Sequence, residues 1–309
     1  MEYNILNRNP LVQSFLTMIK AFLCILFFLS THAFAQTEKT FRITSSYTSF
    51  PDSVRAKGHT YDKVFYSSDE HYNDSSVFIV VPPQLKTKKA VDLVFWFHGW
   101  RNTIDSSANY FELVKQFIAS GRNAVLVIPE TAKNSPDSYG GKLEKKDIFK
   151  NLVGDVIDKL KKEKAIDKKA DAGNIVLAGH SGAFRVMAHI LQNGGMEVKQ
   201  VLLFDGLYSQ VDKYTAWIQA DDTHRFLHIY TNRGGGTDEV SAQMMKGLSE
   251  KSIPFINPEE KELNAGMLKT NRVIFVHSLK EHNNVINRPD HNFRLYLENS
   301  HVLKTTYYK

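Results

Sequence analysis

A serine in a tight strand-to-helix turn is the residue with the clearest capacity for chemistry. The apolar run 174–178 leads into Gly-His-Ser-Gly-Ala at 179–183, and a helical pattern follows. A turn this sharp strains the backbone of Ser181 and requires small residues two positions before and after it. Gly179 meets the first requirement, whereas Ala183 stands where glycine is usual and is a mild departure. A serine held in this way becomes a nucleophile once a neighbouring base takes its proton.

A second short motif closes an earlier apolar run. Residues 90–97 lead into His-Gly-Trp at 98–100, about 80 residues before the serine. These two motifs, in this order, resemble the α/β-hydrolase fold family, and the resemblance covers most of residues 76–301. It implies an oxyanion hole made of two backbone N–H groups, one from Gly182 and one from the His-Gly loop at Trp100.

The same resemblance implies a histidine base beyond the last strand, because the family orders its triad as serine, acid, histidine. The run 272–278 is that strand, and His282 follows it. We therefore choose His282 as the base. His291 is the reserve, since it lies nine residues further on, at the start of a terminal helical pattern.

The acid has two candidates, because the family places it after either of two strands. Asp205 directly follows the run 200–204, at a sharp strand exit. Asp238 follows the run 225–230 after a glycine-rich interval, which makes it look like an N-terminal helix residue stabilised by the helix dipole. We favour Asp205 and keep Asp238 as the alternative.

Three further side chains could line a substrate pocket. His180 precedes the serine, Tyr208 follows Asp205 by three residues, and Tyr139 lies in a loop after the run 123–129. A Gly-Gly turn that feeds the next helix explains the Tyr139 loop equally well, and aromatic residues of a large domain more often belong to the core.

Cofactor-binding motifs are missing from the sequence. It contains no G-x-x-x-x-G-K-[ST], no dinucleotide-binding G-x-G-x-x-G and no H-E-x-x-H. We therefore expect neither a nucleotide cofactor nor a catalytic metal. The lone cysteine, Cys24, lies in the N-terminal apolar segment, so a mature chain starting after it would have no disulfide and no cysteine nucleophile.

Strands alternate with amphipathic helices over most of the chain, and this pattern predicts the fold. Continuous apolar strands separated by helices imply a mostly parallel sheet covered on both faces. Three strand-like runs near the N-terminus, with only turns between them, predict an antiparallel edge. Strands are expected at 41–48, 62–67, 76–81, 90–97, 123–129, 174–178, 200–204, 225–230 and 272–278, and helices at 108–120, 146–161, 183–191 and 239–248.

The composition fits one globular domain. Of 309 residues, 42% are hydrophobic and 23% charged, which is enough apolar material for a large core. The net charge is +6 and its lysines occur as scattered pairs, so no nucleic-acid-binding stripe is predicted. Residues 36–309 are expected to form a single α/β-hydrolase-like domain.

The N-terminal segment is typical of a secretory signal peptide. Lys20 precedes the apolar run 21–29, and Ala-Phe-Ala at 33–35 provides a cleavage site. The run of nine residues is far shorter than the roughly 20 that a membrane-spanning helix needs. We therefore expect cleavage after Ala35, an exported periplasmic or extracellular protein, and no stable membrane span. Translation from Met18 would leave the same mature chain.

These features favour a secreted serine hydrolase that cleaves a carboxylic ester. Its substrate could be a small molecule or an ester on a glycan or another polymer. Two alternatives stay open at this stage: an amidase or peptidase with the same triad, and an inactive hydrolase-like envelope protein that only binds.

Overall fold

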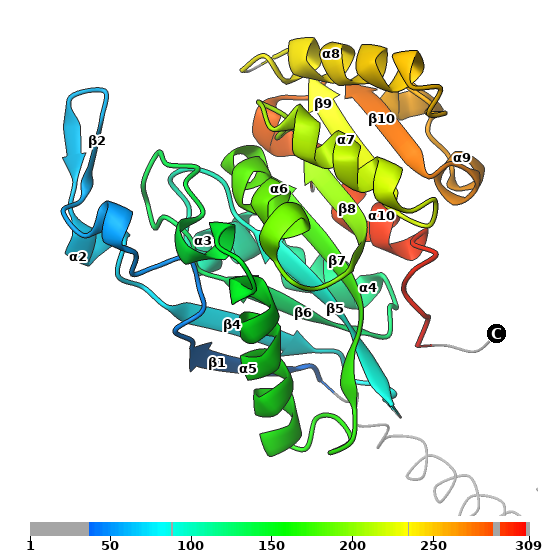
Figure 1. The fold of residues 1–309 in the computed structure, drawn as a ribbon. Coiled ribbons are helices and arrows are strands. Elements are labelled where there is room, and N and C mark those ends of the chain that lie inside the picture. Colours follow the sequence, from blue (N-terminus) through cyan, green and yellow to red (C-terminus); the bar gives the residue numbers. More distant parts are fainter. Residues whose placement is uncertain (1–36, 88, 234, 287–290, 307–309) are drawn as a thin grey trace, which may run out of the picture. The chain divides into compact units, whose positions relative to one another are not determined.

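A computed structural model describes residues 37–306, apart from residues 88, 234 and 287–290 (Figure 1). Residues Glu38–Lys309 form one compact unit, as judged by the contacts within the chain. The predicted signal peptide, residues 1–35, lies outside the described residues. Within the described ranges, no helix has the length and apolarity needed to cross a bilayer.

A single mixed sheet forms the centre of this unit. Among the described residues it contains eight strands in the order β1-β4-β6-β5-β7-β8-β9-β10. Strand β4 is antiparallel to both β1 and β6, and all the other pairs are parallel, which confirms the predicted sheet and its antiparallel N-terminal edge. The strands are β1 (Lys39–Thr44), β4 (Ser76–Val81), β5 (Ala90–Phe97), β6 (Ala124–Pro129), β7 (Asp171–His180), β8 (Val198–Phe204), β9 (Arg225–Thr231) and β10 (Val273–Ser278).

Helices cover both faces of the sheet because alternate residues of its buried strands point to opposite sides. One apolar cluster joins the sheet to α5, α6, α7 and α8, and the other joins it to α3, α4, α9 and α10. The helices are α2 (Ser68–His71), α3 (Ile104–Tyr110), α4 (Leu113–Ala119), α5 (Ile148–Lys162), α6 (Phe184–Asn193), α7 (Val211–Ala220), α8 (Thr237–Glu250), α9 (Ala265–Thr270) and α10 (Asn292–Glu298), and the 3₁₀ helices are η1 (Ser53–Arg55), η2 (Gly141–Glu144), η3 (Ser181–Ala183), η4 (Glu260–Glu262) and η5 (His282–Val285).

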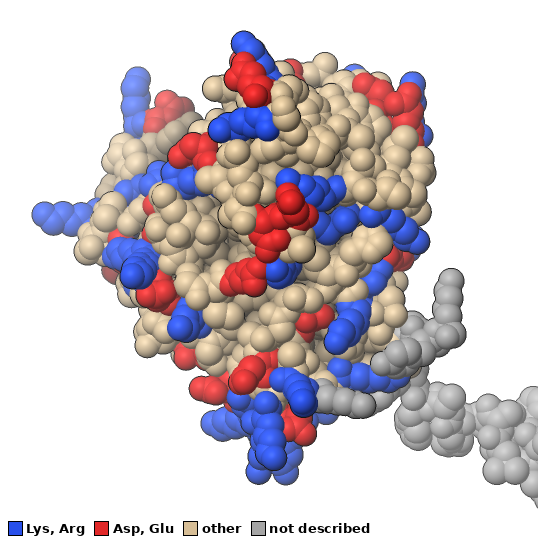
Figure 2. Space-filling view, turned by 45° about the vertical axis from the view of Figure 1, so that its right-hand side comes forward, with Lys and Arg blue, Asp and Glu red and all other residues tan. Residues whose placement is uncertain are grey.

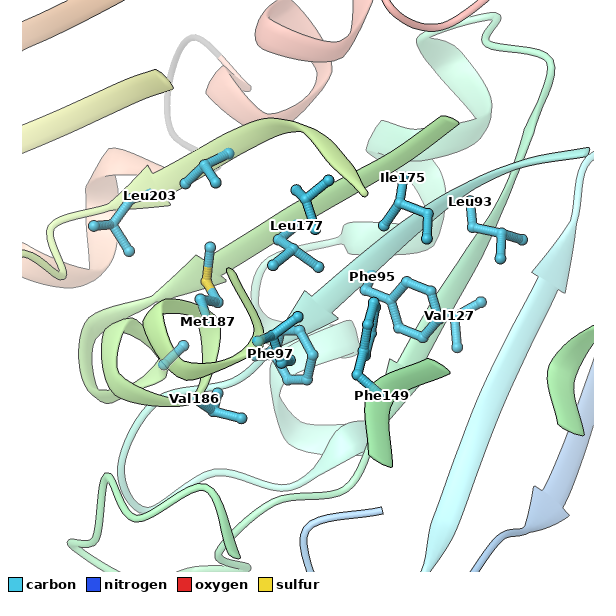
Figure 3. Close-up of a cluster of buried hydrophobic side chains, with 14 of the residues drawn as sticks. Leu93, Phe95, Phe97, Val127, Phe149, Ile175, Leu177, Val186, Met187 and Leu203 are labelled. Atoms are coloured by element: carbon cyan, nitrogen blue, oxygen red, sulfur yellow. The ribbon is translucent and has the colours of Figure 1, made fainter. Parts of the chain in front are cut away.

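Figure 3 shows the first cluster, in which side chains from α5 and α6 meet those of the central strands. Phe95 of β5 packs edge-on against Phe149 of α5, with ring centroids 4.8 Å apart. Met187 of α6 is fully buried, as are Leu177 and Leu203 of the two neighbouring strands. This packing fixes the orientation of α6, the helix that follows the serine turn.

Several elements differ from the sequence expectation. The helix expected at 108–120 is two helices, α3 and α4, because Glu112 between them adopts a left-handed conformation. Helices α2, α7 and α9 are not predicted by the sequence pattern. The strand expected at 62–67 is instead part of a separate hairpin of β2 (His59–Tyr61) and β3 (Val64–Tyr66), which turns at Asp62 and Lys63, both with positive φ.

The charged surface is mixed in sign. In the view of Figure 2, Lys and Arg side chains lie interspersed with Asp and Glu side chains over the face shown. The ion pairs of the described residues include Lys159 with Glu163 and Arg294 with Glu298.

Candidate active site

The order of the sheet determines where a site can form. The chain passes from β5 to β6 on one side, and β7 pairs with β5 on the other side. In such sheets a crevice opens beyond the carboxyl ends of the two strands where the connection changes direction. The loop 98–100 follows β5, and Ser181 follows β7, so both sequence motifs lie at this crevice.

Ser181 occupies a strained turn that glycines make possible. Its φ is +53°, in the left-handed region that costs a residue with a side chain about 1 kcal/mol or more. A Cβ on Gly99 would lie 2.8 Å from the Cβ of Ser181, and one on Gly179 would lie 2.7 Å from the Cβ of Ala183. Because Ala183 already fills the space between strand and helix, position 179 has no room for a methyl group.

Asp205 follows β8 and is completely buried, with 0% of its side chain exposed. The backbone N–H of Thr231 donates to Oδ1 at 3.0 Å, and the hydroxyl of Thr237 also donates to Oδ1. Burial raises the pKa of this carboxyl, but hydrogen bonds from His282, Thr237 and Thr231 outweigh burial, so its pKa lies below the usual value. Asp205 is therefore held as a carboxylate.

His282 begins η5, just after β10, and its Nδ1 lies 2.5 Å from Oδ2 of Asp205. Its side chain is 26% exposed. Because the carboxylate can only accept a hydrogen bond, Nδ1 carries the proton and Nε2 keeps its lone pair. Ser181 and His282 line the same cavity.

The two reserve residues lie elsewhere. Asp238 is in the first turn of α8 and lines a separate pocket with Tyr230 and Asn232. It is Thr237, the residue before it, that reaches Asp205. The Nδ1 atom of His291 lies 4.0 Å from a carboxylate oxygen of Glu112. The histidine that contacts Asp205 is His282.

The loop after β5 is anchored by a second histidine–carboxylate pair. His98 is buried, with Nε2 2.5 Å from Oε1 of Glu130 and Nδ1 2.8 Å from the carbonyl oxygen of Gly99. The other oxygen of Glu130 accepts from the N–H of Ile104 at 3.1 Å. Sequence reasoning missed Glu130. Its position at the carboxyl end of β6, directly beside β5, is the signal that could have found it.

Trp100 covers the turn after the serine. A Cβ on Gly182 would lie 2.5 Å from Cδ1 of the indole, so the glycine is pressed against the ring. The indole N–H donates to the hydroxyl of Ser138 at 2.7 Å. The side chain of Trp100 therefore packs against Gly182, the other residue predicted to supply an N–H of the oxyanion hole.

A cavity of about 600 Å³ opens over these residues. It is polar with an aromatic margin, and Tyr61 from the β2–β3 hairpin contributes to it, which no feature of the sequence indicated. Its lining comprises Tyr61, Trp100, Arg101, Asn102, His180, Ser181, Tyr208, His282 and Asn283.

The three residues predicted as possible pocket lining have different positions. His180 and Tyr208 line the cavity. Tyr139 does not belong to its lining: its hydroxyl donates to Asp52 at 3.0 Å, and its ring lies under the guanidinium groups of Arg55 and Arg185. The alternative interpretation of this loop, a structural turn, describes Tyr139 better.

Burial keeps the side chains of His180 and Tyr208 uncharged near neutral pH. Burial lowers the pKa of His180 to about 3, and the neighbouring His282 adds to the effect. Burial and the charge of Asp205 raise the pKa of Tyr208 to about 12. Neither group can therefore substitute for His282 as a base near neutral pH.

One group of side chains among the described residues has ligand atoms close enough to hold a metal ion: Glu197, Asp221 and His224. It lies before β8 and β9, at the amino ends of the strands, opposite the cavity. The ammonium group of Lys199 contacts both of these carboxylates, so a cation is already present between them.

No protein-family model matches the chain, and no curated protein matches it. Solved structures do. The fluorophosphonate-binding serine hydrolase F of Staphylococcus aureus aligns with a TM-score of 0.50 at 11% identity, over 85% of this chain and 100% of that one. A feruloyl esterase module from Clostridium thermocellum, in complex with sinapinate, aligns with a TM-score of 0.51 at 10% identity, over 89% of this chain and 92% of the module. Together with the sheet order, these likenesses show that the chain has the α/β-hydrolase fold.

Proposed function

We propose that this protein is an exported serine hydrolase that cleaves a carboxylic ester through an acyl-enzyme. One observation carries the proposal. Ser181 has a left-handed backbone conformation and lines the same cavity as His282. Nδ1 of His282 is hydrogen-bonded to the buried carboxylate of Asp205.

In the first half of the reaction Ser181 is the nucleophile. As its Oγ attacks the ester carbonyl carbon, Nε2 of His282 takes the hydroxyl proton. The carbonyl oxygen becomes an oxyanion, and the backbone N–H groups of Gly182 and Trp100 donate to it. Each such donor contributes about 3 kcal/mol to lowering the barrier.

The second half releases the product and restores the serine. His282 gives its proton to the leaving alcohol, which departs and leaves Ser181 acylated. Water then loses a proton to His282 and attacks the acyl carbon, and the same proton returns to Ser181 as the carboxylic acid leaves. No cofactor enters this sequence.

Asp205 positions the base throughout. Its low pKa keeps it ionised across the working range, so Nδ1 of His282 stays protonated and Nε2 is the nitrogen left to accept the serine proton. The buried carboxylate also stabilises the imidazolium that forms while His282 holds the serine proton.

One observation supports an ester over an amide: the structural neighbour from Clostridium thermocellum is, by its description, a feruloyl esterase module. The N-terminal signal pattern, which supports export, would give the protein access to small-molecule, glycan or polymer esters outside the cytoplasm.

Fluorophosphonate labelling tests the proposal directly. We expect the purified protein to be labelled on Ser181, Ser181→Ala to lose the label, and the control variant Ser249→Ala, on α8 and outside the cavity lining, to keep it. An aryl acetate should be hydrolysed at least a hundredfold faster than the corresponding anilide. A folded but unlabelled protein would favour the binding-protein alternative, and a preference for the anilide would favour an amidase.

Export is tested separately. We expect the native protein to begin at or near Gln36. Recovery of a native protein that retains residues 20–30 would contradict export by signal cleavage.

A further inference from the structure

The cavity contains one permanently charged side chain, Arg101, among its lining residues. Arg101 is exposed, and within the described part of the chain no carboxylate or carbonyl oxygen accepts from its guanidinium group. The eight other described arginines all place the guanidinium on such an acceptor: Arg42, Arg55, Arg122, Arg185, Arg225, Arg233, Arg272 and Arg294. Arg101 is the exception, and it lines the cavity of the candidate active site.

The backbone fixes Arg101 at this place. Its φ is +56°, a conformation that a residue with a side chain adopts only when its surroundings hold it there. Its N–H donates to the carbonyl oxygen of Ser135 at 3.0 Å, and the N–H of Asn134 donates to the carbonyl oxygen of Asn102 at 2.9 Å. The loop that follows Trp100 is thus bonded to a second loop on both sides of Arg101.

Two aromatic rings lie beside this cation. Tyr61 and Trp100 meet edge to face, with ring centroids 5.2 Å apart, and each residue is 39% exposed. Tyr61 belongs to the β2–β3 hairpin, which projects from the body of the unit in Figure 1. A ring of the substrate can pack against this pair while a charge on the same substrate reaches Arg101.

We propose that Arg101 selects esters that carry a carboxylate next to a ring packed on Tyr61 and Trp100. The inference rests on the proposed function and names the substrate class of the same site. A guanidinium group with free donors pairs with a carboxylate through two parallel hydrogen bonds. No acid of the cavity lining competes for it, because the carboxylate of Asp205 is buried behind His282.

Two matched esters measure this selection. 4-Acetoxybenzoate and 4-acetoxybenzamide have the same ring and acetyl group and differ by one charge. We expect the protein to prefer the carboxylate by roughly ten- to a hundredfold in kcat/KM, the size of a charge-assisted hydrogen bond. The preference should shrink as salt is added, because the cation is exposed.

Variants assign the preference to one residue. Arg101→Gln should reduce the ratio of the two kcat/KM values to near one, and Arg101→Lys should keep part of it. Arg233→Gln is the matched control: it removes an exposed arginine that is paired with Glu281 and does not line the cavity, so it should keep the ratio.

Each result bears on the inference in a defined way. If Arg101→Gln slows both esters equally, Arg101 acts on the oxyanion and does not select substrates. Equal rates for the two esters in the unmodified protein also overturn the selection, while labelling of Ser181 would leave the proposed function standing. If Ser181 is not labelled and neither ester is hydrolysed, the proposed function fails and the inference fails with it.

Discussion

Two of the histidine–carboxylate pairs in the described part of the chain share the same short distance but differ in environment. His98 with Glu130 and His282 with Asp205 each bring a ring nitrogen to 2.5 Å from a carboxylate oxygen. The side chain of His98 is 1% exposed, whereas that of His282 is 26% exposed. Both nitrogens of His98 face oxygen atoms. In contrast, His282 lines the cavity and contacts its carboxylate through Nδ1 alone.

The comparison shows that a short bond to a carboxylate does not by itself make a histidine a base. A base needs a second nitrogen with a free lone pair, directed at the group it deprotonates. Both nitrogens of His98 face oxygen atoms of the protein and the residue does not line the cavity, so it instead links the end of β5 to the end of β6. The first pair is therefore interpreted as structural support for the loop 98–100 after β5, and the second as the proposed base and its positioning acid.

Removing the base should have the largest effect. His282→Ala is expected to lower kcat by roughly four to six orders of magnitude, close to the effect of Ser181→Ala, because members of a triad act as one unit. Steady-state kinetics with an aryl acetate measures this. The double variant should be scarcely slower than either single one, and a clearly additive loss would show that the two residues do not act together.

The positioning acid should have the next largest effect. Asp205→Asn keeps the shape but lets the amide impose the wrong tautomer on His282, so a loss of up to about 10⁴-fold in kcat is expected. Asp238→Asn is the matched control, since it lies in a different pocket and should change kcat little. The opposite order of the two effects would move the acid to the later strand.

The structural pair should affect stability more than chemistry. Glu130→Ala leaves a buried nitrogen of His98 without its hydrogen-bond partner, which costs about 1–3 kcal/mol of unfolding free energy. Urea unfolding measures this loss. The same measurement on Asp205→Ala gives the loss of unfolding free energy for the second pair. If Glu130→Ala leaves stability intact but removes activity, His98 has a direct part in the reaction.

Local patterns in the sequence reveal most of the elements and the serine turn, whereas the choice of Asp205 and His282 depends on the resemblance to the α/β-hydrolase fold. The apolar strands and the serine turn are visible because each depends on neighbours within about ten residues. The order of the strands then brings Ser181 and His282 to one edge, even though about a hundred residues separate them.

Contacts between distant loops are not visible in the same way. Glu130 acts on His98, and Tyr61 enters the cavity from a hairpin, through packing that no periodicity encodes. The break at Glu112 is missed for a related reason. The apolar spacing continues across it, although the backbone there turns left-handed.

Substitution of His180 should have the smallest effect of the four residues considered, after His282, Asp205 and Glu130. Because His180 is buried without a carboxylate partner, it tests the effect of burial alone. It is buried beside His282, with ring centroids 4.4 Å apart, and has no carboxylate partner among the described residues. Burial lowers its pKa to about 3, so the folded protein resists protonating it. The unfolded chain takes up that proton near pH 6.5. Stability from this group is therefore complete above about pH 6.5 and is lost as pH falls toward 3, with a slope of at most about 1.4 kcal/mol per pH unit.

His228 behaves in the same way, because burial lowers its pKa to about 4. Urea unfolding at a series of pH values between 3.5 and 7 should therefore show the free energy of unfolding falling on acidification, and His180→Gln should make the fall less steep. His228→Gln is the matched variant, since His228 does not line the cavity, and it should reduce the slope by a comparable amount. The slope is the test because either substitution also changes packing, which shifts the free energy at all pH values alike. If His180→Gln leaves the slope unchanged while His228→Gln reduces it, His180 is protonated in the folded protein, and its contact with His282 must then be reinterpreted as part of a proton-sharing pair.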